Sequence, residues 1–273
     1  MKRTILIIVA IVSVAGFASA DTSFSLSQNP PAGTATEGTF PDAPNITQNT
    51  DPNTLEAGSV ACVDSGPPQS STENHYLRRF FLNADHGIVD PYNVTSVDYG
   101  VESATGITVT DIPLNITLYT IASGAAFTFA NLTQIGSSST TIPDGTSLQF
   151  FNLPVTGFVD DPIGKDLVVD IWTPDGTIGP DFSLFIGSNA LGQTQPAYLA
   201  ADDCGLPDPA TTASIGFPDM HIVMTVNGDL VVGPTPTPPP TGGEPIPTMN
   251  RYGIVIMVAL LIGVAILVMW RRN

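Results

Sequence analysis

Apolar and polar residues alternate along several segments of the chain between about residues 61 and 232. The segments are "SVDYGVE", "LNITLYTI", "AFTFANLT", "DLVVDIW", "FSLFIG" and "MHIVMTV". In the second of them, Leu114, Ile116 and Leu118 occupy every other position. Because successive side chains of a strand point to opposite faces, this spacing is typical of half-buried antiparallel strands. No stretch of the same region repeats apolar residues at helical spacing over three or more turns.

Turn signals separate the alternating segments. They are Pro143-Asp144-Gly145, Pro174-Asp175-Gly176 and Asn227-Gly228, all built from residues that favour chain reversal. A series of short strands of this total length is enough to enclose one core between two stacked sheets. The pattern therefore predicts a mostly β fold over residues 61–232, an antiparallel β-sandwich of jelly-roll-like form.

Residues 1–20 have the features of an export signal. Lys2 and Arg3 precede an apolar run, and the small residues Ala18 and Ala20 stand just before Asp21. This order of charge, apolar core and cleavage site predicts a helical signal peptide that signal peptidase removes, leaving Asp21 as the first mature residue. An uncleaved N-terminal anchor is the alternative.

The C-terminus carries an apolar stretch of membrane-spanning length. Gly253 to Trp270 contains 18 residues and no charge, and a helix of that length covers roughly 27 Å, close to the hydrocarbon thickness of a bilayer. Arg271 and Arg272 follow directly and are expected to stay on the cytoplasmic side. We therefore expect one C-terminal transmembrane helix, with the bulk of the chain outside the cytoplasm.

Composition divides the exported part further. Residues 21–60 are rich in Thr, Pro, Asn, Gly and Ala, which predicts a flexible N-terminal arm with at most one short strand, around Phe24 to Leu26. Residues 233–245 read "GPTPTPPPTGGEP", and a segment that lacks so many backbone N–H groups is expected to be an extended linker. Such a linker would hold the β domain away from the membrane.

The exported part is strongly acidic. Between Asp21 and Glu244 lie all 25 acidic residues and three bases, Arg78, Arg79 and Lys165, which gives a formal charge of 3 − 25 = −22. This charge excludes nucleic acid as a partner and disfavours anionic lipid surfaces.

Cys62 and Cys204 are the two cysteines of the chain. Both lie in the exported part, and export into an oxidising space makes a disulfide between them the first expectation.

The sequence predicts no enzyme, because no G-x-S-x-G nucleophile motif is present. His86 beside Asp85 and His221 near Asp219 are candidates for acid–base chemistry, but each position is more typical of a turn or strand edge. Together with His75, these histidines are too far apart in sequence to suggest a zinc site.

Carboxylates cluster at two places, Asp160, Asp161 and Asp166 in one and Asp202 with Asp203 in the other. Loop aspartates are ligands that Ca²⁺ prefers, but neither cluster has the D-x-D-x-D-G form. We therefore expect solvated turns and no cofactor, with a structural calcium ion as the alternative.

Arg78 and Arg79 precede the apolar segment "FFL". Since adjacent residues of a strand face opposite ways, one arginine is expected to point inward to a buried carboxylate and the other to be solvated. A ligand clamp is the alternative.

The segment before the apolar stretch resembles the IPTL-type C-terminal sorting signal of Gram-negative bacterial surface proteins, which reads I-P-T-L-x-x-W-G before an apolar helix and a basic end. The matching residues are Ile246, Pro247, Thr248, Met249, Tyr252 and Gly253, followed by Arg271 and Arg272. Met249 and Tyr252 replace the Leu and Trp of that pattern. The resemblance covers residues 246–273 and implies processing by an exosortase, a membrane transpeptidase that would be a partner. A permanent single-span anchor is the alternative.

The β domain is similar to a family of uncharacterised secreted bacterial domains. The similarity lies in "NHYLRRFFL", "NVTSVDYGVE", "LYT", "FIGSNALGQTQPAYLAADDCG" and "IGFPDMHIVMTVNG". It implies no catalytic residue, and it supports the strands and the pairing of Cys62 with Cys204.

Together these features predict an exported bacterial protein of the cell surface or extracellular matrix, with a structural or adhesive role. It would pass through an inner-membrane intermediate to the cell surface, the outer membrane or the medium. The alternative is a glycan-binding module for surface polysaccharide, with Trp172, Tyr92 or Tyr198 as its aromatic platform. A row of exposed rings on one sheet face would favour glycan binding, and a convergent Asp/His pocket with shifted pKa values would favour a hydrolase, the third possibility.

Overall fold

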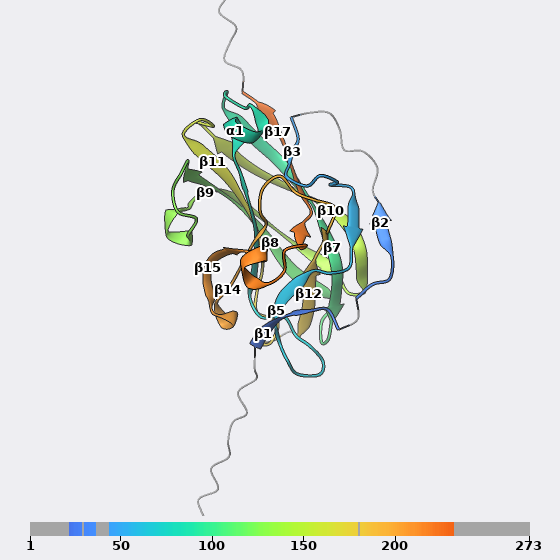
Figure 1. Cartoon of the computed structure of the whole chain (residues 1–273). Coiled ribbons are helices and arrows are strands. Elements are labelled where there is room, and N and C mark those ends of the chain that lie inside the picture. Colours follow the sequence, from blue (N-terminus) through green and yellow to red (C-terminus); the bar gives the residue numbers. More distant parts are fainter. Residues whose placement is uncertain (1–21, 29, 37–43, 180, 232–273) are drawn as a thin grey trace, which may run out of the picture. The chain divides into compact units, whose positions relative to one another are not determined.

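The computed structural model describes residues 22–28, 30–36, 44–179 and 181–231 (Figure 1). The signal peptide, the 233–245 linker, the 246–273 sorting signal and the terminal Arg271 and Arg272 lie outside the described residues, so these assignments stay predictions. Within the described residues, no helix is both long enough and apolar enough to cross a membrane.

Two large antiparallel sheets make up most of the fold. One sheet runs in the order β10 (Thr146–Val159), β7 (Tyr92–Gly106), β17 (Met224–Leu230) and β3 (Ile46–Thr47), with β12 (Phe182–Ile186) also paired to β7. The other runs in the order β15 (Leu206–Thr211), β14 (Tyr198–Ala201), β6 (Asn74–Phe80), β11 (Lys165–Thr173), β8 (Asp111–Ala122) and β9 (Thr133–Pro143).

Shorter elements complete the fold. β1 (Thr22–Leu26) pairs with β5 (Val60–Asp64), and a small sheet runs in the order β16 (His221–Ile222), β13 (Ser188–Asn189), β4 (Thr54–Glu56) and β2 (Thr34–Thr36). The helices in the described residues are α1 (Leu82–His86) and the 3-10 turns η1 (Phe129–Asn131), η2 (Asp202–Cys204) and η3 (Thr212–Ile215).

The main core lies between the two large sheets, as the period-two pattern predicts. Leu114, Ile116 and Leu118 of β8 are fully buried in one cluster with Val97 and Val226 of the facing sheet. Figure 1 shows β7 and β10 of one sheet and β9 and β11 of the other. The mostly β class and its sandwich-like arrangement are therefore confirmed.

Two predicted details of the sandwich are wrong. The segment "AFTFANLT" is not a strand but the loop between β8 and β9, and it contains η1. Asn227-Gly228 is not a turn but a bulge inside β17. Gly228 is needed there because a Cβ atom would lie 2.5 Å from the Tyr92 ring and 2.6 Å from the Asn93 carbonyl oxygen, well inside ordinary contact distance.

The described part of segment 21–60 is built into the fold and does not form a loose arm. It supplies β1, β2, β3 and β4, and β1 includes the short strand expected near Phe24. Ile46 and Leu55 are buried. Leu55 packs on Gly100 and Gly187, where any larger side chain would overlap it.

The disulfide between Cys62 and Cys204 is present. It joins β5 to η2, with the two Cα atoms 6.0 Å apart. A disulfide is typical of proteins that work in an oxidising compartment outside the cytoplasm.

Candidate functional site

The outer face of the six-stranded sheet, the face away from the main core, carries a second apolar cluster. Along β6, Tyr76 and Phe80 belong to the main core, and Leu77 belongs to the outer cluster. Because side chains alternate along a strand, His75 and Arg79 share the outer face with Leu77. The β8–β9 loop covers part of this face and packs Phe127 and Phe129 against it.

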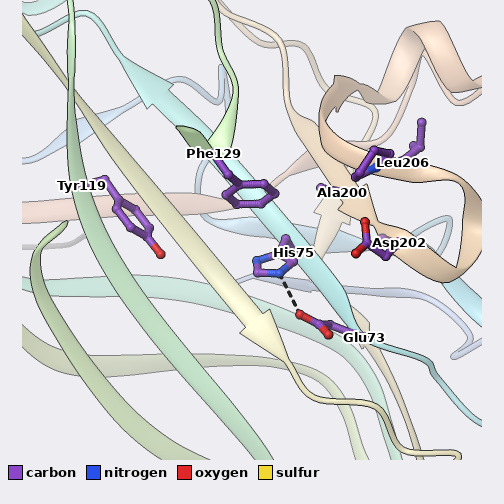
Figure 2. Close-up of a pocket in the computed structure, with 9 residues that line it drawn as sticks. Glu73, His75, Tyr119, Phe129, Ala200, Asp202 and Leu206 are labelled. Atoms are coloured by element: carbon purple, nitrogen blue, oxygen red, sulfur yellow. Dashed lines mark hydrogen bonds and ion pairs between the residues drawn. The ribbon is translucent and has the colours of Figure 1, made fainter. Parts of the chain in front are cut away.

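A cavity of about 240 Å³ opens on this outer face beside the loop. Figure 2 shows the rings of His75, Phe129 and Tyr119 around it, with the carboxylates of Glu73 and Asp202 at its rim. The remaining wall comes from Ala200 and Ala201 of β14 and from Leu206 and Pro207 at the start of β15. Residues from four strands and three connecting segments therefore converge here.

His75 lies at the centre of a polar network in this cavity. Its Nδ1 lies 2.8 Å from Asp170 Oδ2, and its Nε2 lies 3.1 Å from Glu73 Oε1. The indole Nε1 of Trp172 donates to the same Glu73 oxygen at 2.8 Å. The Phe129 ring is tilted against the imidazole, with centroids 4.9 Å apart. Both ring nitrogens of His75 are thus held by carboxylates.

The two carboxylates control the charge of the imidazole. Burial by itself lowers the pKa of His75, but hydrogen bonds and charge attraction from Asp170 and Glu73 outweigh it and raise the pKa above 6.5. Complete burial raises the pKa of Asp170, and the imidazole opposes that shift. The site therefore favours an imidazolium that donates to both neighbours.

We predict that His75 titrates above pH 6.5 and that His86 and His221 titrate below it, because burial lowers the pKa of those two rings. Since folding raises the pKa of His75, its contribution to stability is complete below about pH 6.5 and is lost as the pH rises through the folded pKa. NMR titration of the three imidazole rings measures this order directly. Glu73→Gln should lower the His75 value, and a His75 ring that titrates below His86 would contradict the network.

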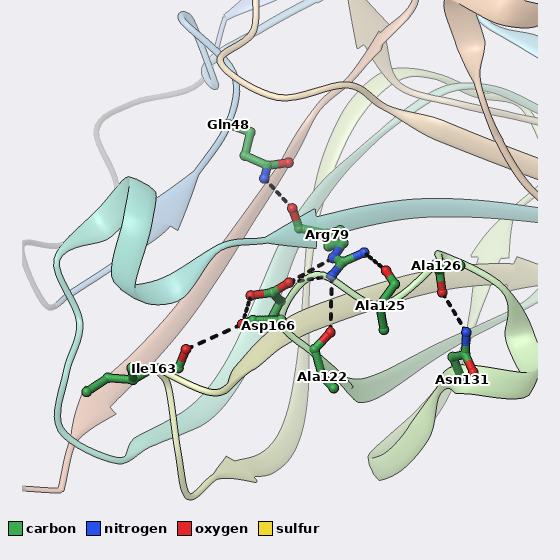
Figure 3. Close-up of polar contacts among 9 residues, drawn as sticks. Gln48, Arg79, Ala122, Ala125, Ala126, Asn131, Ile163 and Asp166 are labelled. Atoms are coloured by element: carbon green, nitrogen blue, oxygen red, sulfur yellow. Dashed lines mark hydrogen bonds and ion pairs between the residues drawn. The ribbon is translucent and has the colours of Figure 1, made fainter.

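A buried ion pair fixes the loop that carries Phe129. Arg79 donates from Nε and Nη2 to Asp166 Oδ2 at 2.9 and 2.6 Å, and from Nη1 to the Ala125 carbonyl oxygen at 2.8 Å (Figure 3). Ser123 donates to the other Asp166 oxygen at 2.8 Å. The backbone N–H of Phe129 donates to Asp208 at 2.9 Å. The Phe129 wall is therefore held in place from β6, β11 and β15.

The opposite rim of the cavity is fixed by the disulfide. Cys204 ends η2, the same turn that presents Asp202 to the cavity. β1 also contacts this turn, since Thr22 donates to the Asp203 carbonyl oxygen at 2.7 Å. The carboxylate of Asp202 is exposed and accepts no hydrogen bond from the described residues.

The expectation for the arginine pair is only partly correct. Arg79 does meet a buried carboxylate, but on the outer face of the sheet. Arg78 points inward and is fully buried, where it donates to the carbonyl oxygens of Ile222 and Gln195 and to the side chain of Gln193. Burial lowers its pKa to about 9. Neither arginine is solvated. Backbone carbonyl oxygens accept the hydrogen bonds of Arg78, and the carboxylate of Asp166 accepts those of Arg79.

The other candidates lie away from this cavity. His221 accepts from the backbone N–H of Gly192, and the ring of His86 lies near Phe80.

Among the rings expected to form an aromatic platform, Tyr92 is buried and donates a hydrogen bond to the Pro44 carbonyl oxygen, so it cannot contact a ligand. Of the expected platform rings, Trp172 and Tyr198 do lie half-buried on the outer face.

The acidic clusters are not assembled into one ligand set. Asp160 pairs with Lys165, Asp161 accepts from the Gly164 backbone, and Asp166 is held by Arg79. Within the part of the chain that the structure describes, no group of three His, Cys, Asp or Glu side chains is placed to hold a metal ion.

His75 and Glu73 were missed by sequence reasoning. The sequence contained only a weak signal. The segment "NHYLRRF" indicates a strand, but the partner of His75, Asp170, is 95 residues away along the chain. The network appears only when β6 and β11 are placed in register.

Comparisons with known proteins add little to this description. No protein-family model and no curated protein matches the chain. One solved structure with some similarity contains the cysteine protease and lectin-like domains of Cwp84, a surface layer associated protein of Clostridium difficile. The two chains are 15% identical over 66% of this chain and 40% of that one, with a TM-score of 0.38. A similarity this low does not bear on the fold or the site.

Proposed function

We propose that this is an exported bacterial surface protein with an adhesive role, whose β domain binds a saccharide of the cell surface or matrix. The observation that carries the proposal is one open cavity that combines the rings of Phe129 and Tyr119 with the carboxylates of Glu73 and Asp202. Aromatic rings offer flat apolar surface for the C–H face of a sugar, and carboxylates accept hydrogen bonds from its hydroxyl groups.

The neighbouring sheet surface supports an extended ligand. In the register of the strands, His75 lies beside Trp172, Trp172 beside Asn115, and Asn115 beside Ser139. Each of these residues is half-buried or exposed. Three strand spacings of about 4.8 Å make this row roughly 14 Å long, so an oligosaccharide fits better than a single sugar. We also propose that the two antiparallel sheets form a sandwich of jelly-roll-like type.

The cavity does bring His75 together with carboxylates, and the pKa values of His75 and Asp170 are shifted, which is the pattern expected of a hydrolase. The hydrogen bonds of His75 nevertheless favour binding over catalysis. A catalytic histidine needs one ring nitrogen free to exchange a proton with the substrate or nucleophile, whereas both nitrogens of His75 face carboxylates. Among the described residues, the lining of the cavity includes no Ser, Thr or Cys, which disfavours a hydrolase with a hydroxyl or thiol nucleophile. We therefore propose a binding protein and no enzyme.

Screening the full-length chain against immobilised bacterial polysaccharides and oligosaccharides tests this function. We predict that Phe129→Ala weakens binding to the selected saccharide about fivefold, because loss of one stacked ring is worth about 1 kcal/mol. Phe158→Ala is the matched control, since that ring is 48% exposed on β10 of the other sheet. Binding of no saccharide, or equal losses in the two variants, would reject the proposal.

We propose that two signals, the apolar segment of residues 1–20 and the tail of residues 246–273, direct the protein to the cell surface. Signal peptidase would release Asp21 as the new N-terminus, and an exosortase would act on the segment from Ile246 to Gly253. The extended conformation that Pro247 favours would present this segment to the enzyme above the apolar helix. The disulfide supports the non-cytoplasmic side of this proposal.

We predict that the mature protein from its native cells lacks residues 1–20 and everything beyond about Thr248. Intact-mass measurement of each cell fraction checks both cuts at once. A Thr248→Ala, Pro247→Ala variant should retain the tail and stay in the inner membrane. If the unaltered protein keeps Trp270 and the terminal arginines, the tail is a permanent anchor and the exosortase proposal is wrong.

A further inference from the structure

The saccharide cavity is negatively charged and contains no Lys or Arg among its lining residues in the described structure. Glu73 uses Oε1 to hold His75 and Trp172, while its Oε2 accepts no hydrogen bond from the described residues and its side chain is 46% exposed. Asp202, across the cavity, has a carboxylate without a partner in the same residues. Two carboxylates are therefore available to a ligand.

A third carboxylate, that of Asp170, is hydrogen-bonded to His75 of the cavity wall. Asp170 is 1% exposed, and its Oδ1 has no hydrogen-bond partner in the described part of the chain. It bonds to His75 and acts electrostatically on Tyr119, and both of these residues line the cavity. A buried acceptor without a partner is costly, so a positive charge or a hydrogen-bond donor near Asp170 and His75 would stabilise this side of the site.

The described residues supply little positive charge to offset these groups. Arg78 and Arg79 are buried against other partners, and Lys165 pairs with Asp160. Even with His75 protonated, three carboxylates against one imidazolium leave the site negative. The rings of Phe129 and Tyr119 also attract cations through their faces, and the exported part as a whole is strongly acidic.

We propose that the ligand carries a protonated primary amine, and that the saccharide is therefore a polysaccharide with unacetylated amino sugars. This inference rests on the saccharide-binding function proposed above. An ammonium group placed between Glu73 and Asp202 makes charge-assisted hydrogen bonds to both, which are about twice as strong as neutral ones. An acidic sugar is repelled at the same place, and an N-acetyl group offers neither the charge nor the three donors.

Calorimetric titration of the full-length chain in detergent tests the inference with two matched probes, a glucosamine tetramer and its fully N-acetylated counterpart. We expect the amine form to bind at least about tenfold more tightly. Asp202→Asn and Glu73→Gln should each reduce this preference severalfold. Asp90→Asn is the matched control, because Asp90 is an exposed aspartate outside the cavity, and it should leave the preference unchanged.

The outcomes separate the inference from the function on which it rests. Equal binding of both tetramers overturns the inference and leaves saccharide binding in place. If neither tetramer binds while other saccharides do in the screen, the amine requirement is again wrong. If no saccharide binds at all, both proposals fail. If Nα-acetyl-lysine amide binds as tightly as the amine tetramer, the site recognises an amine but not a sugar, and the inference is also overturned.

Discussion

Replacing Cys62 and Cys204 together with alanine is expected to lower the free energy of unfolding by about 2–5 kcal/mol. The two cysteines are 142 residues apart in sequence, so the disulfide closes a long loop in the unfolded chain. In the chain-entropy description, a loop of that length gives an upper value of about 5 kcal/mol. Urea denaturation of both proteins, followed by far-UV circular dichroism, measures the difference.

The same substitution should also weaken saccharide binding. The disulfide ties β5 to η2, and η2 carries Asp202 at the rim of the cavity. Without the bond, the hydrogen bond from Thr22 to Asp203 and the pairing of β1 with β5 are left to hold this rim. Unaltered protein treated with a reductant is the control and should shift in the same direction. Identical urea midpoints for the oxidised and substituted proteins would show that the bond adds nothing to stability.

Arg79→Met is expected to cost about 3–5 kcal/mol, because it leaves the buried carboxylate of Asp166 without its counter-charge. The Arg79 and Asp166 side chains are 7% and 4% exposed, so water does not replace the lost partner. The guanidinium also donates to the carbonyl oxygen of Ala125 and lies 5.8 Å from the Phe127 ring centre. The β8–β9 loop should therefore loosen, and Phe129 with it.

A double-mutant cycle separates charge from packing. Arg79→Met combined with Asp166→Leu should recover much of the lost stability, since replacing both members of a buried pair with apolar residues is often close to neutral. Lys165→Met is the matched control, because its ion pair with Asp160 is exposed and such pairs contribute little. If Arg79→Met and Lys165→Met unfold at the same urea concentration, the ion pair does not hold the loop.

The local alternation of apolar and polar residues was sufficient to predict the strands of the main core and their buried faces. Leu114, Ile116 and Leu118 are all buried, as their spacing predicts, because a period of two is a property of the strand itself and needs no knowledge of its neighbours. With two cysteines in an exported chain, one pairing was available, and it is the one observed.

In the segment before Val60, the local sequence pattern did not predict which residues are buried. This segment has few large apolar residues, and composition alone therefore indicated a loose arm. Ile46 and Leu55 are nevertheless buried, because glycines far along the chain leave room for Leu55. "AFTFANLT" shows the reverse error: its alternating rings belong to a loop that packs on the outer face of a sheet.

By itself, the sequence determined the mostly β class, the disulfide and the acidic character, because these depend on period, count and charge. Only the tertiary structure decided that Arg79 meets Asp166, that Arg78 is satisfied by carbonyl groups, and that His75 lies between Asp170 and Glu73. Alternation states which side chains of one strand share a face. Strand order and register, which bring residues about 90 positions apart within hydrogen-bond distance, are set by how the sheets pack as a whole.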